Sequence, residues 1–336
     1  MNIKLRVATS IFIILFFALG LNNLFGQSNS NNGFPKITPF INIFSDFNSN
    51  LNSNNTLGGF ELTRAHLGLK ASLSDNIDGI VCYDATSPND GSRLDRTGYL
   101  KQAYLRFYTK QIALNFGMIP LKQMDLLENF WGHRYVYRSF QEQYGFGYFY
   151  DLGTTLEYKP SAEFSFDASF MNGEGIFSNQ KDNTYKGGLG VTYFLDKWLV
   201  VREYADVTAK SATQSTLSSF IGITPAESFS LGGEFNYQWN NNYLINHNFY
   251  GFSFYSTYNI TNKYDVFARY DYLKSDKVGV SLTDWNENND GEKIIVGAEY
   301  KILSNVRFSV NYQNWLPSLS EVKNIQKLYL DFEIKY

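Results

Sequence analysis

The chain contains one cysteine, Cys82, among its 336 residues, which excludes an intramolecular disulfide and any cysteine-rich metal site. Charged residues are also scarce, at 18%, whereas an ordinary soluble domain has about 25%. The two signs nearly balance, and the net charge of −3 argues against a general nucleic-acid binder. A mean hydropathy of −0.28 excludes a bundle of membrane helices, because each such helix needs about 20 consecutive apolar residues.

Aromatic residues, by contrast, are abundant. Phe, Tyr and Trp together make up 18% of the chain, and hydrophobic residues of all kinds make up 44%. A chain of this composition can bury a large apolar surface, so wholesale disorder is not expected. The sequence therefore describes a large folded protein that is both aromatic and polar.

The N-terminal region has the features of an export signal. Two basic residues, Lys4 and Arg6, precede an apolar run at 7–21, and small residues follow it. The run is shorter than the roughly 18 residues of a membrane-spanning helix, so a lone membrane anchor is the weaker interpretation. We expect a signal peptide cleaved after Gly26, with a cut after Gly20 as the alternative. Cleavage would remove both basic residues and change the net charge from −3 to −5.

From Lys36 onward the sequence divides into segments of about 8–12 residues that alternate in polarity. Similar alternation occurs at 62–73, 162–170, 264–272 and 305–315. Because side chains alternate between the two faces of a strand, each segment is predicted to be a strand between a polar and an apolar environment. The C-terminal segment shows the pattern best, with apolar side chains at every second position: Leu328, Leu330, Phe332, Ile334 and Tyr336.

Half-polar strands occur in soluble sandwiches as well as in membrane barrels, so other features must decide between the two. Charges and large amides occupy the polar faces in segment after segment, and Tyr and Trp gather at segment ends, as in the aromatic girdle of a membrane barrel. In a bilayer, strands can pair all their backbone polar groups only by closing into a barrel. We therefore predict an all-β fold, a transmembrane antiparallel β-barrel over 36–336, preceded by a signal peptide at 1–26 and a short polar tail at 27–35.

The number of strands follows from the segments. A single-chain bacterial barrel has an even number of strands, whereas the alternation suggests seventeen segments. Residues 144–151 are the weakest of these, since they also fit the return limb of a loop, and about sixteen strands are expected. The segments lie near 36–46, 59–73, 76–86, 99–109, 111–118, 144–151, 153–159, 162–171, 185–194, 198–208, 216–223, 228–239, 247–259, 263–274, 292–302, 305–315 and 324–336.

The longest segment without clean alternation is 118–144. Long irregular loops in compact folds are usually functional or disordered, and the lumen of a barrel of about sixteen strands is wide and water-filled. We expect this loop to fold inward and narrow the lumen, with an outward extracellular loop as the alternative. Apolar residues such as Leu127 and Phe130 favour the inward position, because a solvated loop would expose them. The candidate constriction residues are Lys122, Asp125, Glu128, Trp131, Arg134 and Arg138.

The polar faces of the strands supply the predicted wall of the lumen. Acidic residues such as Asp271 and Glu333 share these faces with basic ones, so the charges would partly cancel beyond the Debye length of about 8 Å. We therefore expect weak ion selectivity. One residue conflicts with the pattern, because Glu203 shares a face with Leu199 and Val201; a bulge, a membrane-edge position or a subunit interface would explain it. The lumen-lining candidates are Arg64, His66, Lys70, Arg106, Arg269 and Arg307.

No motif for catalysis or cofactor binding is found in the sequence. The three histidines, His66, His133 and His247, lie far apart and lack the short spacing of metal ligands. The acidic stretch 284–292 begins like a calcium loop, but Asn289 stands where the sharp-turn glycine belongs and the bidentate glutamate is missing. The chain has no Gly-x-Ser-x-Gly elbow and no phosphate-cradling motif before a helix. We expect no catalytic residue, no metal and no cofactor.

Five short stretches resemble one known family in the expected order. They are Phe-Glu-Leu-Thr-Arg-Ala-His-Leu-Gly-Leu-Lys at 60–70, Asn-Phe-Gly-Met-Ile-Pro at 115–120, Phe-Met-Asn-Gly-Glu-Gly at 170–175, Phe-Ala-Arg-Tyr-Asp at 267–271 and Val-Asn-Tyr-Gln at 310–313. The chain thereby resembles an outer-membrane porin, most closely the phosphate-selective porin O and P family. Membership would imply a sixteen-stranded barrel, commonly trimeric, with a loop folded into the lumen. The phosphate-specific members line their pores with many Lys and Arg, whereas this chain would be acidic after cleavage, so phosphate selectivity is not carried over.

The favoured hypothesis is a porin in the outer membrane of a bacterial cell, through which small polar or ionic solutes diffuse passively along a water-filled lumen. An outer-membrane barrel enzyme of hydrolase type is one alternative, and it would need a nucleophile and a base within hydrogen-bond reach. An adhesive or structural barrel that acts through its outer loops is another. The expected partners are the solutes, outer-membrane lipids, barrel-assembly machinery acting on the last strand, and further copies of the chain in a homotrimer. No nucleic-acid partner is expected.

Overall fold

The computed structural model describes residues 33, 35–52, 58–86, 97–279, 283–319 and 321–336. The predicted signal peptide at 1–26 lies outside the described residues, as does the polar tail at 27–35 apart from Gly33 and Pro35. Within the described residues, sixteen strands form one closed barrel in which neighbouring strands pair antiparallel.

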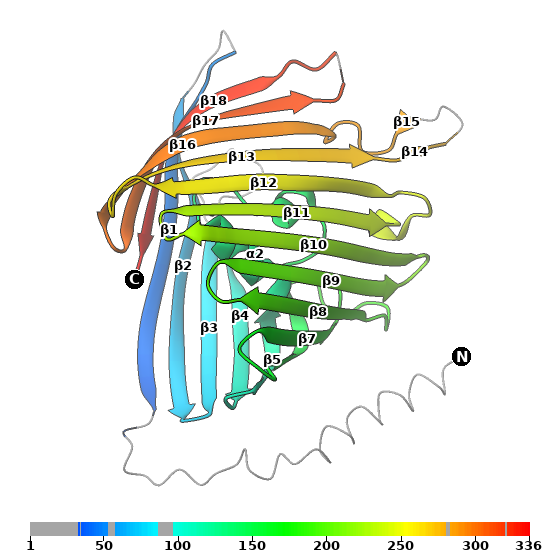
Figure 1. Cartoon of the computed structure of the whole chain (residues 1–336). Coiled ribbons are helices and arrows are strands. Elements are labelled where there is room, and N and C mark those ends of the chain that lie inside the picture. Colours follow the sequence, from blue (N-terminus) through cyan, green and yellow to red (C-terminus); the bar gives the residue numbers. More distant parts are fainter. Residues whose placement is uncertain (1–32, 34, 53–57, 87–96, 280–282, 320) are drawn as a thin grey trace.

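The barrel consists of two sets of eight strands. The first set is β1 (Lys36–Asn50), β2 (Gly59–Ser74), β3 (Ile77–Thr86), β4 (Thr97–Tyr108), β5 (Ile112–Pro120), β6 (Tyr150–Tyr158), β7 (Phe164–Met171) and β8 (Lys186–Leu195). The second set is β9 (Leu199–Ala209), β10 (Thr213–Ala226), β11 (Phe229–Trp239), β12 (Phe249–Asn259), β13 (Tyr264–Ser275), β16 (Gly291–Leu303), β17 (Val306–Pro317) and β18 (Ile325–Lys335). The strands are tilted, so that β1–β4 run across the direction of β8–β13 in Figure 1.

The remaining elements lie in the connections between barrel strands. A small hairpin of β14 (Lys277–Val278) and β15 (Thr283–Asp284) follows β13. The helices are α2 (Lys122–Trp131), α3 (Phe140–Tyr144) and the 3-10 helix η2 (Asn241–Tyr243). None of the helices in the described part of the chain is long and apolar enough to cross a membrane.

The prediction of a sixteen-stranded barrel is confirmed, and every barrel strand overlaps a segment expected from the alternation. The separate strand suggested at 144–151 is wrong, because 144–149 form the end of α3 and an irregular stretch, and 150–151 are the first residues of β6. Gly145 and Gly147 have φ angles of 75° and 139°, which residues with a side chain rarely adopt. Between them, Phe146 is buried against Phe140 and Phe249 rather than alternating along a strand.

Side chains alternate between the two faces of the barrel wall as the sequence predicts. In β18, Phe332 and Ile334 are 42% and 39% exposed on the outer face, whereas Asp331 and Glu333 are 2% and 5% exposed on the inner face. The same division between apolar outer and polar inner side chains recurs in β7, β13 and β17. An apolar outer band around a polar interior is the arrangement of a membrane barrel.

The two ends of the barrel have different connections. At one end the connections between strands have only two to five residues, whereas at the other end they reach 29 residues, between β5 and β6. Outer-membrane barrels have short periplasmic turns and longer extracellular loops, which assigns the first end to the periplasmic side. The ring closes at this end through Ile41 and Tyr336, whose backbone N–H groups donate to each other's carbonyl oxygens at 2.9 and 3.0 Å.

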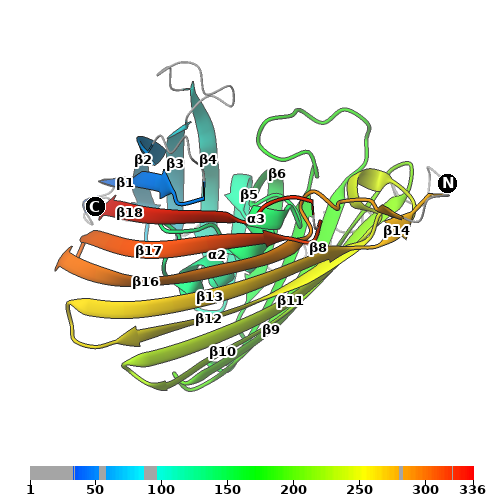
Figure 2. The same cartoon turned by 90° about the horizontal axis from the view of Figure 1, so that it is seen from above.

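Residues 121–149, which connect β5 to β6, lie inside the barrel and are called the inner segment below. Figures 1 and 2 show α2 enclosed by the strands. The expected inward position of 118–144 is therefore observed, although 118–120 complete β5 instead. Leu127 and Trp131 of α2 are buried among side chains from six strands, namely Phe44, Val200, Phe220, Tyr255, Phe267 and Ile295.

Two glycines on the inner face of the wall make room for the inner segment. A Cβ atom on Gly222 of β10 would lie 2.4 Å from the ring of Phe130, and one on Gly251 of β12 would lie 2.5 Å from the ring of Phe140. Both distances are far below van der Waals contact, so the two rings occupy space that any other residue would fill. The wall is thus shaped to hold the inner segment in this position.

Glu203 remains the exception on the outer face. It is exposed near the middle of β9, where its carboxylate accepts a hydrogen bond from Ser219 Oγ of β10 at 2.7 Å. The pairing of β9 with both neighbours continues without a bulge. A bulge is therefore excluded, which leaves a membrane-edge position and a subunit interface as explanations of this charge.

Candidate functional site

Four charged side chains connect the inner segment to the barrel wall. The guanidinium group of Arg64, which projects inward from β2, lies 4.0 Å from Glu128 Oε1 and 3.8 Å from Glu142 Oε1. Arg134 approaches the same two carboxylates from the inner segment, at 3.5 Å from Glu128 and 2.6 Å from Glu142. These four residues are called the charged bridge below. Their two positive and two negative charges balance.

The wall beside the charged bridge carries further polar side chains. Asp84 Oδ2 of β3 lies 3.8 Å from Arg64 Nε, 2.9 Å from His66 Nε2 and 3.3 Å from Lys101 Nζ. The Lys101 ammonium also lies 2.9 Å from His66 Nε2 and 4.8 Å from the centre of the Tyr150 ring. The charged bridge is thus continuous with a polar cluster on β2–β4.

Lys101 reaches the lumen because the pairing of β3 with β4 is irregular. The register shifts by one residue between Cys82 and Tyr83, which leaves Lys101 as an extra residue in β4. Strict alternation would place Lys101 on the outer face with Leu105, so the sequence pattern did not identify it as a lumen residue. The sequence did contain one indication of the bulge, because strict alternation would place a charged lysine on the face that meets lipid.

The pKa of Glu142 is set by the charges around it. Burial alone would raise the pKa of this carboxyl, but the guanidinium groups of Arg134, Arg64 and Arg138 hold it below its ordinary value. Glu142 is therefore ionised at neutral pH. This ionisation preserves its contacts with both arginines of the charged bridge.

A second set of charges faces the lumen toward the periplasmic end. Lys122 Nζ at the start of α2 lies 3.2 Å from Glu157 Oε2, and Arg106 Nη1 lies 3.2 Å from Glu157 Oε1. One turn along α2, Asp125 is exposed and forms no ion pair with any residue in the described ranges. Ionisable groups with partly or fully exposed side chains therefore lie inside the barrel on the periplasmic side of the charged bridge.

Arg269 of β13 fixes the returning limb of the inner segment. Its Nε and Nη2 donate to the two carboxylate oxygens of Asp271 at 2.7 and 2.8 Å, and its Nη1 donates to Arg138 O at 2.7 Å. The guanidinium lies 5.2 Å from the ring centre of Trp131 and 5.3 Å from that of Tyr137. Protein groups therefore surround Arg269, which anchors the inner segment and is shielded from the lumen water.

Arg307 of β17 anchors the start of the same limb. It lies 3.3 Å from Glu299 and donates to Gly132 O at 3.1 Å. Tyr135 Oη donates to Glu299 Oε2 at 2.7 Å, and His133 Nδ1 lies 3.2 Å from the same oxygen. These contacts fix residues 132–135 to β16 and β17.

Two buried amides fix the helices of the inner segment to the opposite wall. Gln123 Nε2 donates to Ser218 Oγ at 2.9 Å, while Gln123 Oε1 accepts from Arg202 Nε at 2.6 Å. Gln141 Nε2 donates to the same Ser218 Oγ at 2.7 Å. Arg202 in turn pairs with Asp167 at 2.7 Å. The inner segment is therefore held on both sides of the lumen.

The structure separates the predicted constriction residues into two groups. Trp131 is only 1% exposed, and its indole N–H donates to Tyr137 O at 3.0 Å, so it anchors the segment and does not face the lumen. Of the other five, Glu128 and Arg134 belong to the charged bridge. The side chains of Lys122, Asp125 and Arg138 are at least partly exposed.

The predicted lumen-lining residues also separate. Arg64 and His66 lie at the charged bridge or beside it, while Arg106 lies toward the periplasmic end. Lys70 pairs with Asp78 at 3.0 Å near the turn after β2. As described above, the other two arginines, at 269 and 307, anchor the inner segment, because backbone carbonyls of that segment meet their guanidinium groups. The alternation of polar and apolar residues in a strand does not reveal which backbone atoms of a distant loop will contact its side chains.

The histidines are dispersed in the structure as in the sequence. His66 and His133 contact carboxylates, and His247 Nδ1 lies 3.2 Å from Ile245 O. Among the described residues, none of the three forms a hydrogen bond with a serine hydroxyl. The described part of the chain also contains no group of three or more His, Cys, Asp and Glu residues that could hold a metal ion.

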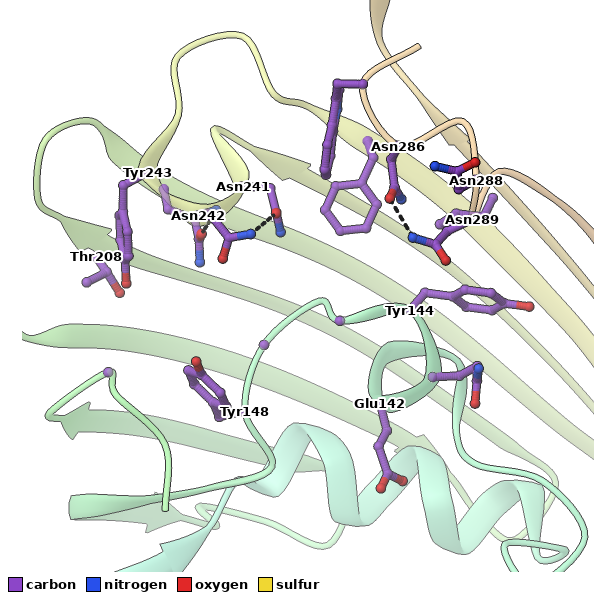
Figure 3. A pocket seen from close by; sticks show the side chains of 18 of the residues that line it. Glu142, Tyr144, Tyr148, Thr208, Asn241, Asn242, Tyr243, Asn286, Asn288 and Asn289 are labelled. Carbon is purple, nitrogen blue, oxygen red and sulfur yellow. Dashed lines mark hydrogen bonds between the residues drawn. The ribbon is translucent and has the colours of Figure 1, made fainter. Parts of the chain in front are cut away.

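A cavity of about 650 Å³ opens on the extracellular side of the inner segment and is called the outer cavity below. Figure 3 shows Glu142 of the charged bridge beside it, with tyrosine and asparagine side chains around it. The lining includes residues of α3 and of the connections after β11 and β13. The charged bridge therefore lies between the outer cavity and the charges on the periplasmic side.

Solved structures with the same architecture include outer-membrane proteins. A loop L8 deletion mutant of OmpT from Vibrio cholerae aligns with a TM-score of 0.68 and 14% identity, over 90% of this chain and 99% of that chain. Salmonella typhi OmpF in complex with daunomycin aligns with a TM-score of 0.67 and 13% identity, over 90% and 98%. An anion-selective porin from Comamonas acidovorans aligns with a TM-score of 0.63 and 8% identity, over 90% and 99%. At such low identities these likenesses show the fold.

The family follows from the sequence comparison. No curated protein matches the chain. The model of the family described as putative beta-barrel porin-2, OmpL-like, matches residues 138–324, which is more than half of the chain. This match supports an outer-membrane porin, while the finer resemblance to the phosphate-selective porin O and P family is not confirmed. The chain belongs to the putative beta-barrel porin-2, OmpL-like family, and it is a porin-like β-barrel of the outer membrane.

Proposed function

We propose that small polar and ionic solutes diffuse passively through this barrel and that the charged bridge is the narrowest point of their path. The observation that carries the proposal is the position of the bridge, which joins the inner segment to β2 between the outer cavity and the exposed charges on the periplasmic side. Across the lumen, the inner segment packs against β9, β10, β12 and β13. Solutes would therefore pass beside the charged bridge.

The charges at the bridge support weak ion selectivity. Two guanidinium groups face two carboxylates, and Asp84 and Lys101 add one charge of each sign. Their separations are below the Debye length of about 8 Å, so a passing solute meets a local field between opposed charges. A site for one oxyanion would instead need several cationic groups without acids between them. Phosphate selectivity is therefore not part of the proposal.

Hydrolysis is not part of the proposal either. A hydrolase would need a nucleophile and a base within hydrogen-bond reach. In the described residues the imidazoles contact carboxylates, a lysine, a threonine and a carbonyl oxygen, which are contacts of positioned polar residues. An adhesive barrel would require neither this chemistry nor a path for solutes.

Planar-bilayer recording tests the proposal. The purified chain should produce discrete conductance steps, and deletion of part of 122–138 should enlarge them, because less of the lumen is then filled. Liposomes that contain the chain should also swell in solutions of small uncharged solutes. A barrel that inserts but neither conducts nor admits solutes would contradict the porin proposal and favour an adhesive or structural role.

We also propose that the chain forms a homotrimer in which the outer face of β9 and β10 contacts another protomer. Glu203 supports this, because a charge on the lipid-facing side of a strand is costly, and the regular pairing of β9 shows no bulge that would explain it. One solved relative, OmpT of Vibrio cholerae, is described in a trimer form. Crosslinking in membranes tests the proposal, since Ser219→Cys should give a crosslinked oligomer and an outer-face control such as Val310→Cys should not.

The remaining partners are proposals that rest on the outer surface. We propose that outer-membrane lipids contact the apolar outer band and that barrel-assembly machinery engages β18. Supporting this, Phe332 and Tyr336 are exposed on the outer face at the end of the chain. The barrel-assembly machinery would therefore act on β18 when the barrel is inserted into the membrane.

A further inference from the structure

The outer cavity has a lining that passive diffusion alone does not require. Its carboxamide side chains come from the neighbouring connections after β11 and β13, and also from Gln143 of α3 and Gln214 of β10. Figure 3 shows the asparagines of both connections together with Tyr144 and Tyr148. Aromatic rings make up much of the remaining lining, among them Tyr144, Tyr148, Tyr243, Phe249, Trp285 and Trp315.

The charged groups in this lining are already occupied by partners. Lys186 Nζ lies 2.7 Å from Asp206, and the Lys293 ammonium lies 4.9 Å from the centre of the Tyr137 ring. Glu142 is held by the two arginines of the charged bridge. A solute that depends on a strong ion pair therefore finds no cluster of unpaired charge of one sign here.

The amides form two pairs on neighbouring connections, one after β11 and one after β13, which contact each other through Trp285 and Asn248. Asn242 Nδ2 donates to Asn241 Oδ1 at 2.9 Å, and Asn289 Nδ2 donates to Asn286 Oδ1 at 2.8 Å. Each carboxamide has two donor hydrogens and an acceptor oxygen with two lone pairs, so each pair retains capacity for further hydrogen bonds. A hydroxyl group both donates and accepts, and it matches such a site.

Several of the aromatic rings are held by neighbouring groups. The indole N–H of Trp285 donates to Asn248 O at 2.6 Å, and its ring meets Phe249 edge-on at 5.6 Å. Tyr144 lies 6.3 Å from Trp315 with an interplanar angle of 32°. Tyr148, at the opposite side of the lining, is 52% exposed. Aromatic rings beside amides provide apolar faces and hydrogen-bonding groups at the same site.

We propose that the outer cavity binds saccharides, that is, neutral solutes whose sugar rings carry several hydroxyl groups, before they pass the charged bridge; this rests on the proposed porin function. The C–H faces of sugar rings would lie on the aromatic rings, and the sugar hydroxyls would hydrogen-bond to the two asparagine pairs. The cavity volume of about 650 Å³ lies within the range of roughly 300–1,000 Å³ that is usual for small-molecule sites. Binding before passage would raise the local concentration of the solute at the constriction.

A blocking experiment with a linear glucose trisaccharide tests the proposal. The trisaccharide, added to the extracellular side of single channels, should interrupt the ion current reversibly, whereas equal concentrations of glycerol or inorganic phosphate should not. The double variant Tyr148→Ala with Asn289→Ala should weaken the block about five-fold or more, as expected for the loss of a stacked ring and an amide. The matched control is Phe177→Ala with Asn262→Ala, which removes an exposed ring and an exposed amide outside the cavity lining, and it should be blocked like the parent.

The outcomes distinguish failure of this proposal from failure of the porin function. A channel that conducts but is not blocked by the trisaccharide, or is blocked equally in parent and double variant, would overturn the saccharide site and leave the porin function intact. Block by phosphate in place of the trisaccharide would overturn it in favour of an anion site. If the protein does not conduct, the porin function fails, and calorimetric titration of the detergent-solubilised full chain with the trisaccharide still decides whether the site exists.

Discussion

Replacing Arg269 by Met should release the returning limb of the inner segment. The guanidinium of Arg269 makes two hydrogen bonds to Asp271 and one to Arg138 O, and both side chains of the pair are fully buried. Removing one partner of a buried ion pair costs about 3–5 kcal/mol, because the other charge remains buried without it. At about 1.4 kcal/mol per factor of ten, detachment of the limb should become about 10² to 4 × 10³ times more frequent.

Hydrogen exchange followed by mass spectrometry measures this detachment directly. Amides in 132–138 should exchange faster in Arg269→Met, and single-channel current should become noisier, because the segment beside the solute path moves. The matched control is Arg106→Met, which removes another lumen arginine that pairs with Glu157 but whose side chain is 32% exposed. Partly exposed pairs contribute about 0–1 kcal/mol, so this control should leave exchange in 132–138 unchanged.

A second variant separates the unpaired charge from the lost packing. Arg269→Met combined with Asp271→Asn removes the orphaned carboxylate, and Ser253 Oγ, which lies 2.6 Å from Asp271 Oδ1, can still hydrogen-bond to the amide. Exchange in 132–138 should therefore return part of the way to that of the parent. Equal exchange in the parent and Arg269→Met, or equal acceleration by Arg269→Met and Arg106→Met, would refute the reasoning.

Three further predictions test the membrane face, the bridge and the closing strand. Arg at Leu69, Phe166 or Val310 should destabilise the barrel by roughly 2–4 kcal/mol if these exposed outer-face positions lie near mid-bilayer. Arg at Ser165 or Asn311, on the inner face, should be tolerated better. Equal urea-unfolding midpoints for both sets would mean that the register is wrong. The pKa of Glu142 is depressed below its ordinary value of 4.5, so its contribution to the stability of the inner segment is complete above that pH and is lost as the pH falls through the depressed pKa. Hydrogen exchange in 121–149 should therefore accelerate only in this acidic window. Glu142→Gln should abolish the acid step. Deleting Tyr336, or changing both Phe332 and Tyr336 to charged residues, should lower the yield of heat-modifiable barrel in the outer membrane. The deletion removes both hydrogen bonds to Ile41 that close the barrel. An unchanged yield would contradict a role of β18 in barrel assembly.

Alternation predicted the barrel well because it reflects one physical constraint that acts on every strand. Each residue of a strand faces either lipid or lumen, so Phe332 and Asp331 differ in polarity for the same reason as their counterparts in other strands. The inward position of the inner segment could be predicted for a related reason, since Leu127 and Trp131 need apolar neighbours. Local chemistry was sufficient wherever the environment of a residue depends on its own strand or helix.

Contacts between distant parts of the chain could not be predicted in this way. Arg64 and Glu142 meet because a loop crosses the lumen, and no periodic pattern encodes that distance. Lys101 was missed because a single-residue bulge reverses the alternation, and Arg269 was assigned to the lumen wall although a loop carbonyl covers it. The site is formed by these exceptions and long-range contacts, and its details therefore required the structure.

The reversal potential of single channels in a salt gradient tests most directly whether the inner segment forms the constriction. Arg134 belongs to the charged bridge, and Arg138 is exposed beside it, so Arg134→Glu with Arg138→Glu should shift the reversal potential clearly toward cation selectivity. The matched control, Lys159→Glu with Lys263→Glu, makes the same change in charge at two exposed periplasmic turns and should leave the reversal potential close to that of the parent. If both double variants gave the parent's reversal potential, or the two shifts were equal, the inner segment would not form the constriction.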